Sequence, residues 1–405
     1  MSQNQEWNRR SFLLTMSGAG TALMLNPLLS WAGNDLDPGI AGIVARTFGI
    51  DTHNHIDVPL IKSELPGPKV DLAGELNKSG LKAICMTFAV DYQKLVNPGD
   101  AYERFLNGLT AMDEILKSNN MQRSLNFKDL ELAKKAKKPT VIQSVEGGHF
   151  LEGKIERLQI TYDRGLRHLG LLHDNDASVP LGDIFTKTPQ WGGLTTFGSE
   201  VIRECERLGI LVDLSHCDNN TVNGALKVAK NPVLVSHTGL NTRLGNNEFM
   251  SKMMMPRLIN NEQAKIVADN GGVIGVWTHL ADSPTEFADN IKAMVDVVGI
   301  DHVCIGTDTK LTPAYRSPND KGWGQGEDKK PQGQNEPPKK ENDQKAQDNN
   351  KKQGSQGTNQ TWGIEKQGFY YTVVESLLNA GFKEGEIAKI GGGNYCRIFD
   401  IATKK

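Results

Sequence analysis

The segment from Gly49 to Pro59, GIDTHNHIDVP, places two histidines and two aspartates within seven residues, directly after a short apolar run. In an extended strand, residues i and i+2 point to the same side, so His53 and His55 can bind one metal ion together. Asp51 and Asp57 are close enough in sequence to orient or supplement this pair. A polar turn after a buried strand gives the same local pattern, so the metal interpretation needs ligands elsewhere in the chain.

Side chains with metal-binding or acid–base chemistry also stand at the ends of later apolar runs. Six of the nine histidines occupy such positions, together with one glutamate and one aspartate. This mixture of imidazoles and carboxylates suits Zn²⁺, and it is large enough for two ions that share one bridging carboxylate. The residues at the run ends are His53, His55, Glu146, His173, His216, His237, His279 and Asp308.

The elements that must position these residues form a regular α/β pattern. From Thr47 onward, eight short β-branched runs alternate with longer amphipathic stretches, which indicates a closed (β/α)8 (TIM) barrel. In such a barrel, the C-terminal ends of all strands meet at one mouth, where the active site lies. An open doubly wound sheet is the alternative, but the glycine-rich phosphate-binding turn typical of it is absent from the sequence. The expected helices are Ala101–Ser118, Phe197–Leu208, Asn261–Asn270, Glu286–Val298, Gly368–Ala380 and Glu384–Ile390.

Composition narrows the classes of partner. The 405 residues carry a net charge of −2, so no global basic field indicates binding to nucleic acid or to acidic lipid, and a small-molecule substrate fits better. The five cysteines form no C-x-x-C pair, and their odd number argues against a disulfide framework. Cys217 follows His216 and could be a thiolate ligand, although a lone cysteine is more typical of core packing.

The N-terminal 32 residues are typical of a bacterial twin-arginine signal peptide. Arg9 and Arg10 precede a weakly apolar stretch that ends in a small-x-small cleavage site at Ser30 to Ala32. This predicts export to the periplasm, with the barrel domain occupying residues 33–405. An uncleaved membrane anchor is the alternative, but the apolar run is short and Pro27 interrupts it. No other segment approaches the length of a membrane span, so stable membrane insertion of the mature chain is not expected.

A low-complexity stretch interrupts the barrel pattern. Between Tyr315 and Ile364 the chain contains no Val, Ile, Leu, Met or Phe. Such a segment buries too little apolar surface to offset its ordering entropy, which predicts a disordered insertion at residues 316–361, after strand eight. A solvated spacer is the expected role, and a lid over the site is the alternative.

Five motifs resemble the membrane dipeptidase family, also called renal dipeptidase. They read VEGGHFLEG, GLRHLGLLH, GLTTFGSEVIRECERLGILVDLSH, PVLVSHTG and HVCIGTD. The resemblance extends from about Thr47 to Ile401, apart from the insertion. It implies a binuclear zinc peptidase built on a (β/α)8 barrel, with two Zn²⁺ ions per chain.

The resemblance also implies roles for individual residues. Glu146 corresponds to the bridging carboxylate, His216 and His237 to ligands of the second zinc, and His173 to the imidazole that contacts substrate. Asp308 corresponds to the residue that exchanges a proton with the attacking water and the leaving amine. Hydrolysis would then proceed through a metal-bridged hydroxide.

Four residues at or near these positions also have structural explanations. Glu146 could instead cap the loop after strand three, but a glutamate among histidines at a barrel mouth needs neutralisation, which a metal pair supplies. His149 and His168 are expected to be structural. His279 matches no family ligand, and it either lines the pocket or has a further role.

Two positions depart from the family pattern. The first motif of the family reads D-x-H-x-D, and His55 stands where its second aspartate belongs. A register in which His55 and Asp57 form the ligand pair is the alternative. The family also carries an arginine three residues before a proline to bind the substrate carboxylate, and Met253 occupies that place here. The residues that could replace this arginine are Arg243, Lys252 and Arg257.

The prediction from these features is a zinc-dependent dipeptidase, with substrates that include dipeptides with a C-terminal D-residue. The expected partners are the dipeptide and a second copy of the chain in a homodimer. Another amidohydrolase-type metal hydrolase, such as a deacetylase or lactonase, is the alternative, but many of those bridge their metals with a carboxylated lysine on strand four. An exported binding protein without catalysis is a third class, which the presence of Asp308 disfavours because a binder needs no proton shuttle.

Overall fold

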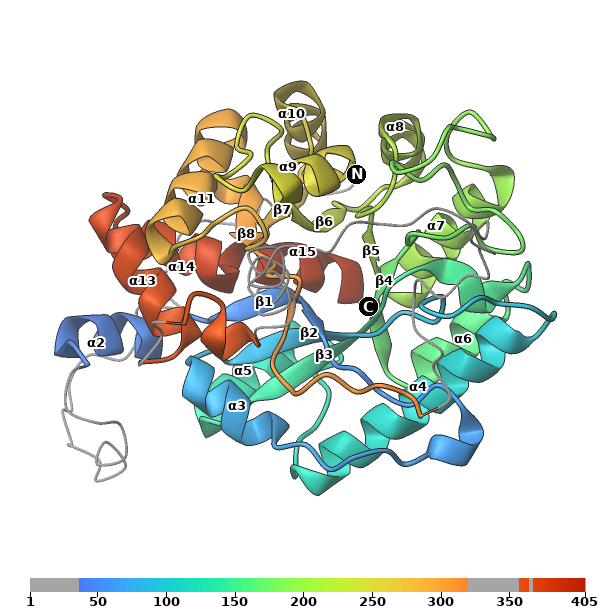
Figure 1. The fold of residues 1–405 in the computed structure, drawn as a ribbon, viewed down its shortest axis with the longest axis horizontal. Helices are drawn as coiled ribbons and strands as arrows, with labels where there is room; N and C mark the ends of the chain where they lie inside the picture. Colours follow the sequence, from blue (N-terminus) through green and yellow to red (C-terminus); the bar gives the residue numbers. More distant parts are fainter. Residues whose placement is uncertain (1–35, 319–356, 364–366, 405) are drawn as a thin grey trace, which may run out of the picture.

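Eight parallel strands form a closed barrel surrounded by helices in this computed structural model, which describes residues 36–318, 357–363 and 367–404 (Figure 1). Each strand pairs in parallel with the next along the chain, and β1 pairs with both β2 and β8, which closes the ring. A short ninth strand pairs with the C-terminal end of β1. The strands are β1 (Ile50–His55), β2 (Ala83–Thr87), β3 (Thr140–Val145), β4 (Leu166–Gly170), β5 (Leu211–Asp213), β6 (Leu234–Thr238), β7 (Val273–Val276), β8 (Val303–Ile305) and β9 (Thr309–Lys310).

The closed barrel confirms the predicted fold class, and all six expected helices are present. One of them, α7, begins where Thr195 caps the backbone N–H of Gly198 and ends at Gly209, whose left-handed backbone stops the helix. The helices are α2 (Pro38–Arg46), α3 (Leu72–Ser79), α4 (Asp100–Ser118), α5 (Phe127–Ala136), α6 (Arg157–Asp163), α7 (Thr196–Leu208), α8 (Asn219–Val228), α9 (Glu248–Met254), α10 (Asn261–Asp269), α11 (Pro284–Val298), α13 (Phe369–Asn379), α14 (Glu384–Ala388) and α15 (Asn394–Thr403).

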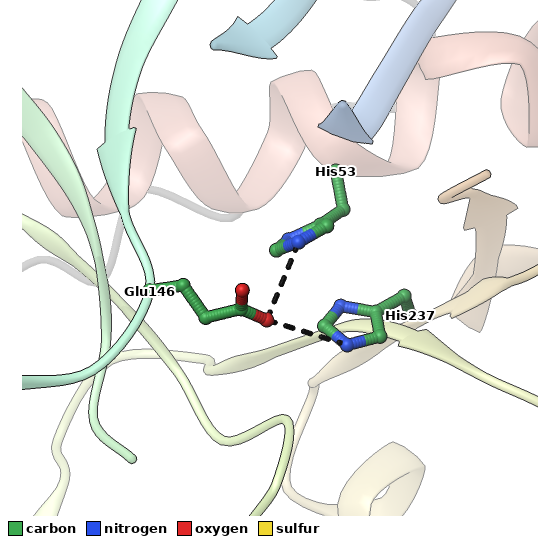
Figure 2. A group of neighbouring side chains, drawn as sticks. All are labelled: His53, Glu146 and His237. Carbon is green, nitrogen blue, oxygen red and sulfur yellow. Dashed lines mark ion pairs between the residues drawn. The ribbon is translucent and has the colours of Figure 1, made fainter. Parts of the chain in front are cut away.

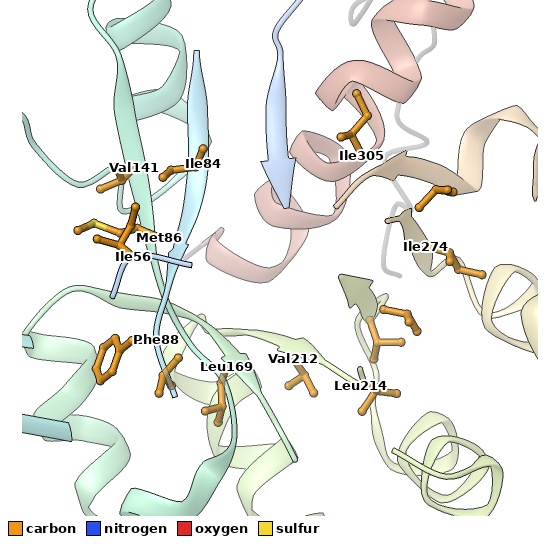
Figure 3. Packing of buried hydrophobic residues seen from close by; sticks show 14 of the residues in the cluster. Ile56, Ile84, Met86, Phe88, Val141, Leu169, Val212, Leu214, Ile274 and Ile305 are labelled. Atoms are coloured by element: carbon orange, nitrogen blue, oxygen red, sulfur yellow. The ribbon is translucent and has the colours of Figure 1, made fainter. Parts of the chain in front are cut away.

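Alternating residues of each strand pack on opposite sides of the barrel wall. On β2, Ile84 and Met86 belong to the layer between strands and helices (Figure 3). Cys85, between them in sequence, belongs to the barrel interior. Helix α15 supplies Tyr395 and Phe399 to the same interior cluster, which contains the first residues of several strands. The apolar interior therefore fills the N-terminal end of the barrel and leaves the C-terminal end to polar side chains. All five cysteines are buried and free, as predicted for small core residues.

The C-terminal boundary of the predicted insertion, residues 316–361, needs correction. Thr358 and Asn359 are buried, and the Thr358 hydroxyl accepts a hydrogen bond from Asn54 Nδ2 over 2.9 Å. Trp362 Nε1 donates to the carbonyl of Ala281 at 2.9 Å. These polar contacts anchor the segment at 357–363 to the barrel without aliphatic side chains, which is why composition alone placed it in the spacer. Residues 319–356 lie outside the described part of the chain.

The predicted signal peptide, residues 1–32, also lies outside the described residues. Within the part of the chain that the structure describes, no helix has both the length and the apolar character needed to cross a membrane.

Candidate metal centre

The predicted side chains converge at the C-terminal mouth of the barrel. Because the strands are all parallel, every strand end opens on the same side, and short extensions beyond the strands carry the remaining residues to the centre. The residues brought together are His53, His55, Glu146, His173, His216 and His237, which are buried, and Asp308, which is half-buried.

Two of these residues adopt a left-handed backbone conformation that side chains rarely take. The φ angle is 67° at His216 and 55° at Asp308, each three residues beyond the end of its strand. Such conformations cost on the order of 1–3 kcal/mol and persist only where the surroundings enforce them. At Asp308, the backbone N–H donates to the carbonyl of His53 at 3.0 Å, which ties the turn after β8 to β1.

The Glu146 carboxylate lies between two pairs of imidazoles. The first histidine pair, His53 and His55, comes from β1, and the second histidine pair is His216 and His237. Glu146 Oε1 is 3.4 Å from His53 Nε2, 2.8 Å from His216 Nε2 and 3.6 Å from His237 Nε2, as Figure 2 shows for two of them. Glu146 Oε2 is 3.6 Å from His55 Nε2. One carboxylate therefore faces all four imidazoles.

The spacing within each pair fits shared coordination of a metal ion. The two Nε2 atoms are 3.2 Å apart in the first histidine pair and 3.0 Å apart in the second. Ligand atoms bound tetrahedrally to zinc at 2.0–2.1 Å are about 3.3 Å apart. Asp308 Oδ1 lies 3.1 Å from His55 Nε2 and supplies a further oxygen beside the first pair.

The charge of Glu146 also fits a metal centre. Its Oε2 atom is buried and accepts no hydrogen bond from the described residues, although an unpaired buried carboxylate oxygen is costly. Burial alone would raise the pKa of Glu146, but the imidazoles of His173, His53 and His216 hold it well below its usual value. The carboxylate is therefore ionised, with a lone-pair oxygen available to a cation.

Each histidine pair combines one imidazole whose pKa is raised with one whose pKa is lowered. Burial alone would lower the pKa of His216, but Glu146 and Asp174 raise it to about 10. Burial lowers the pKa of His237. The first pair repeats this pattern, because Asp308 raises the pKa of His55 against the effect of burial, whereas burial and His237 hold the pKa of His53 well below its usual value. Metal binding at these nitrogens must therefore release protons.

His173 approaches the centre from a separate network. Its Nε2 is 3.2 Å from Glu146 Oε2, and its Nδ1 is 2.6 Å from Asp91 Oδ1. Asp91 also accepts the backbone N–H of Asn175 at 3.2 Å. A buried carboxylate that binds Nδ1 directs Nε2 into the mouth of the barrel.

His279, which matched no family ligand, contacts Asp308. His279 Nε2 lies 2.7 Å from Asp308 Oδ2, so the two oxygens of this carboxylate face different imidazoles. His149 and His168 are buried and bind protein groups, namely the Asn175 carbonyl and the Asp213 carboxylate.

The two candidate registers of the first motif differ in the structure. Asp57 points to Lys310, with Oδ2 2.6 Å from Nζ, and belongs to none of the groups spaced to hold a metal. His55 belongs to one of those groups, with His53 and Asp308. Asp51 accepts hydrogen bonds from Thr307 and from other groups around β1.

A cavity of about 470 Å³ opens beside the second histidine pair. Arg257 lines this cavity together with His216 and His237, and its guanidinium donates to Asp174 Oδ2 at 2.9 Å. Arg243 and Lys252 are exposed and do not line it. Of the three residues suggested as carboxylate-binding cations, the structure therefore brings only Arg257 beside the centre.

Several residues at the centre escaped the sequence analysis. Asp91 and Tyr92 directly follow the second apolar run, where the strand-end pattern could have indicated them. Tyr92 Oη lies 3.0 Å from His55 Nδ1, and Asp174 Oδ1 lies 3.2 Å from His216 Nδ1. Ser236 gave no comparable signal, because it lies inside a strand.

Comparison with known proteins finds similarity to one family of peptidases. The model of the membrane dipeptidase family (peptidase family M19) matches residues 40–315. Mouse Dipeptidase 3 is 25% identical over 269 residues, which cover 63% of this chain and 43% of the mouse protein. An uncharacterized dipeptidase of Schizosaccharomyces pombe is 28% identical over 294 residues, which cover 64% of this chain and 68% of that protein. The chain thus spans less than half the length of the mouse relative.

Solved structures share the fold at lower identity. A metallopeptidase from Rhodobacter sphaeroides, liganded with a phosphinate mimic of the dipeptide L-Ala-D-Ala, has a TM-score of 0.61 at 13% identity, covering 87% of this chain and 99% of its own. An amidohydrolase from Pseudomonas aeruginosa has a TM-score of 0.65 at 21% identity, and the match covers 90% of this chain and 99% of the amidohydrolase. These likenesses support the fold alone. Because the family model matches more than half of the sequence, the chain belongs to the membrane dipeptidase family, peptidase family M19.

Proposed function

We propose that this protein is a zinc-dependent dipeptidase with two metal ions per chain. The observation that carries the proposal is the position of the Glu146 carboxylate, whose oxygens lie within 3.6 Å of all four imidazoles of the two pairs. A deacetylase or lactonase bridged by a carboxylated lysine on strand four is less well supported, because β4 and its extension to His173 contain no lysine.

The donor set fits zinc. Bound zinc would polarise the scissile carbonyl and make water nucleophilic at neutral pH. His53, His55, His216 and His237 would hold the ions, with Glu146 between them. Burial alone would lower the pKa of His173, but Glu146 and Asp91 raise it, which favours the protonated imidazole. Asp91 then holds Nδ1–H, and Nε2–H can donate to the carbonyl oxygen of the substrate and stabilise the negative charge that develops there.

Asp308 is the proposed proton carrier. Burial alone would raise the pKa of this carboxyl, but His237 and His279 lower it well below its usual value, so it is ionised before the reaction. It accepts a proton from the attacking water and returns it to the departing amine nitrogen. His279 contacts Oδ2 of Asp308, and Oδ1 of the same carboxylate faces the first histidine pair.

Arg257 is the proposed binding partner of the substrate carboxylate. Its guanidinium lines the cavity, and a guanidinium binds a carboxylate through two parallel hydrogen bonds. Hydrolysis limited to dipeptides follows, because a longer peptide would place an amide rather than a carboxylate at this guanidinium. The Rhodobacter structure is liganded with a mimic of the dipeptide L-Ala-D-Ala, and on this ground we include dipeptides with a C-terminal D-residue in the proposal.

The test combines metal analysis of the purified protein with hydrolysis assays on L,L and L,D dipeptides and on N-acetylated amino acids. We expect close to two zinc equivalents per chain and hydrolysis of free dipeptides, with no turnover of the N-acetylated compounds. A protein without bound metal after growth in zinc would contradict the proposal. Turnover of N-acetylated amino acids alone would instead identify a deacetylase.

Replacing Arg257 with methionine is expected to raise KM for a dipeptide at least tenfold. The reason is the loss of a charge-assisted contact with the substrate carboxylate, which is worth about 1.5–3 kcal/mol. Steady-state kinetics on the free dipeptide and on its C-terminal amide provide the measurement. The variant should lose most of its preference for the free acid, and an unchanged preference would contradict the assignment. Arg243→Met, at an exposed position outside the cavity, serves as the control.

A further inference from the structure

The hydroxyl of Ser236 lies between the two histidine pairs. On β6, Ser236 Oγ is 3.0 Å from His237 Nδ1 and 3.3 Å from His53 Nδ1. The two imidazoles belong to different pairs, and their ring centroids are only 4.0 Å apart. One buried side chain therefore contacts a ligand of each proposed metal site.

The direction of these hydrogen bonds follows from the remaining contacts. Ser236 Oγ donates its single proton to Asp213 Oδ2 at 2.6 Å. The neighbouring Ser215 hydroxyl uses its proton on Asp213 Oδ1 at 2.9 Å and therefore does not compete. A hydroxyl has two lone pairs, so Ser236 Oγ accepts the Nδ1–H of both His53 and His237. Both imidazoles are thereby held as the tautomer whose Nε2 is free to bind metal.

Asp213 anchors the arrangement beneath the metal centre. Its buried carboxylate accepts the backbone N–H groups of Ser215 at 3.0 Å and Ser236 at 2.9 Å. His168 Nε2 lies 3.2 Å from Oδ2. Burial alone would raise the pKa of Asp213, but His168 and its other partners lower it, so the carboxylate is ionised. The Asp213 carboxylate therefore orients the Ser236 hydroxyl, which in turn contacts both imidazoles.

The other two imidazoles have separate partners. His55 Nδ1 lies 3.0 Å from Tyr92 Oη, and His216 Nδ1 lies 3.2 Å from Asp174 Oδ1. In each pair, one imidazole therefore has a hydrogen-bond partner that it does not share with the other pair, and the orientation of the other imidazole depends on Ser236. A change at Tyr92 or Asp174 acts on one pair, whereas a change at Ser236 acts on both.

We propose that Ser236, anchored by Asp213, is a positioning residue that orients one ligand of each metal site and so couples the affinities of the two sites. The inference rests on the proposed binuclear function. Losing a partner that orients a metal ligand typically lowers metal affinity about 10–100-fold. Ser236→Ala is therefore expected to weaken both zinc ions at least about tenfold, whereas Asp174→Asn is expected to weaken only one by that factor.

The experiment removes zinc from the full-length protein and measures its return in competition with a chromogenic chelator, which resolves the two binding steps. Ser124→Ala is the matched control, because it removes a buried hydroxyl whose hydrogen bond among the described residues is to Thr140 Oγ1, away from the metal centre. NMR of protein with ¹⁵N-labelled histidine gives a second readout. The Nδ1–H signals of His53 and His237 are expected to be protected in the zinc-loaded wild type, and both should exchange faster in Ser236→Ala.

The outcomes separate this inference from the proposed function. A wild-type protein that binds no zinc would refute both. Two zinc ions in the wild type and unchanged affinities in Ser236→Ala would overturn the inference alone. Loss at only one site in Ser236→Ala, or equal loss at both sites in Asp174→Asn, would also overturn it. If Ser236→Ala does not fold, Asp213→Asn retains the serine but removes its charged acceptor, and it must weaken both ions.

Discussion

Replacing Glu146 with glutamine is expected to remove nearly all of the proposed dipeptidase activity and at least one of the two proposed zinc ions. The carboxylate is the group that faces both histidine pairs, and a neutral amide supplies one oxygen instead of two and a nitrogen that repels a cation. Loss of several kcal/mol of transition-state stabilisation corresponds to at least about a thousandfold loss in kcat/KM. Steady-state kinetics and metal analysis of the purified variant provide the measurement.

Glu200→Gln is the matched control, since it makes the same substitution at an exposed position on α7. This variant should retain both ions and the activity of the wild type. If Glu146→Gln kept two zinc ions and more than a tenth of the activity, the carboxylate would not join the two sites. The melting temperature of each metal-free variant shows whether the barrel itself is intact.

The barrel could be predicted because its local signals agree with one another. The strands are short runs, most of which contain β-branched residues, and the intervening helices carry their own start and stop signals, as Thr195 and Gly209 do for α7. The end of the insertion could not be predicted, because Thr358 and Asn359 are held by hydrogen bonds to distant polar groups. Amino-acid composition indicates how much apolar surface a segment can bury, but it does not indicate such hydrogen bonds.

The convergence of the candidate ligands was predictable for a different reason. Parallel strands in a closed barrel must open at one end, so the positions of His216 and His237 in sequence are sufficient to bring them together. The cation beside them could not be singled out in this way. The spacing from a proline led to Met253, which is exposed, and left Arg243, Lys252 and Arg257 as candidates. The path of the segment after β6 decides among them, because it brings Arg257 to the cavity.

The hydrogen bonds beneath the metal ligands could not be predicted from the sequence. In the sequence, Ser236 and Asp213 are polar residues within two otherwise apolar strands, and nothing in the sequence indicates which groups they contact. Their role depends on the stagger between neighbouring strands, which places the Ser236 hydroxyl within reach of an imidazole from β1 and one from β6. Sequence periodicity gives the face of a strand but not this stagger.

The second large effect is expected at His55, where the family has an aspartate. His55→Ala should weaken one zinc ion at least about tenfold, because a direct ligand is worth more than the roughly 10–100-fold effect of a group that only orients one. Asp57→Ala should retain both ions, since its carboxylate pairs with Lys310. Zinc titration of the two metal-free variants against a chelator provides the measurement.

His55→Asp is expected to keep both zinc ions and to extend their binding to lower pH. An imidazole must lose its proton before it binds metal, and Asp308 raises the pKa of His55 against the effect of burial, so protons compete with zinc at this position. An aspartate, with an ordinary pKa of about 3.9, stays ionised at more acidic pH, so zinc occupancy should begin to fall at a lower pH than in the wild type. If Asp57→Ala instead lost a zinc ion while His55→Ala kept both, the ligand pair would be His55 with Asp57 and the first motif would shift by two residues.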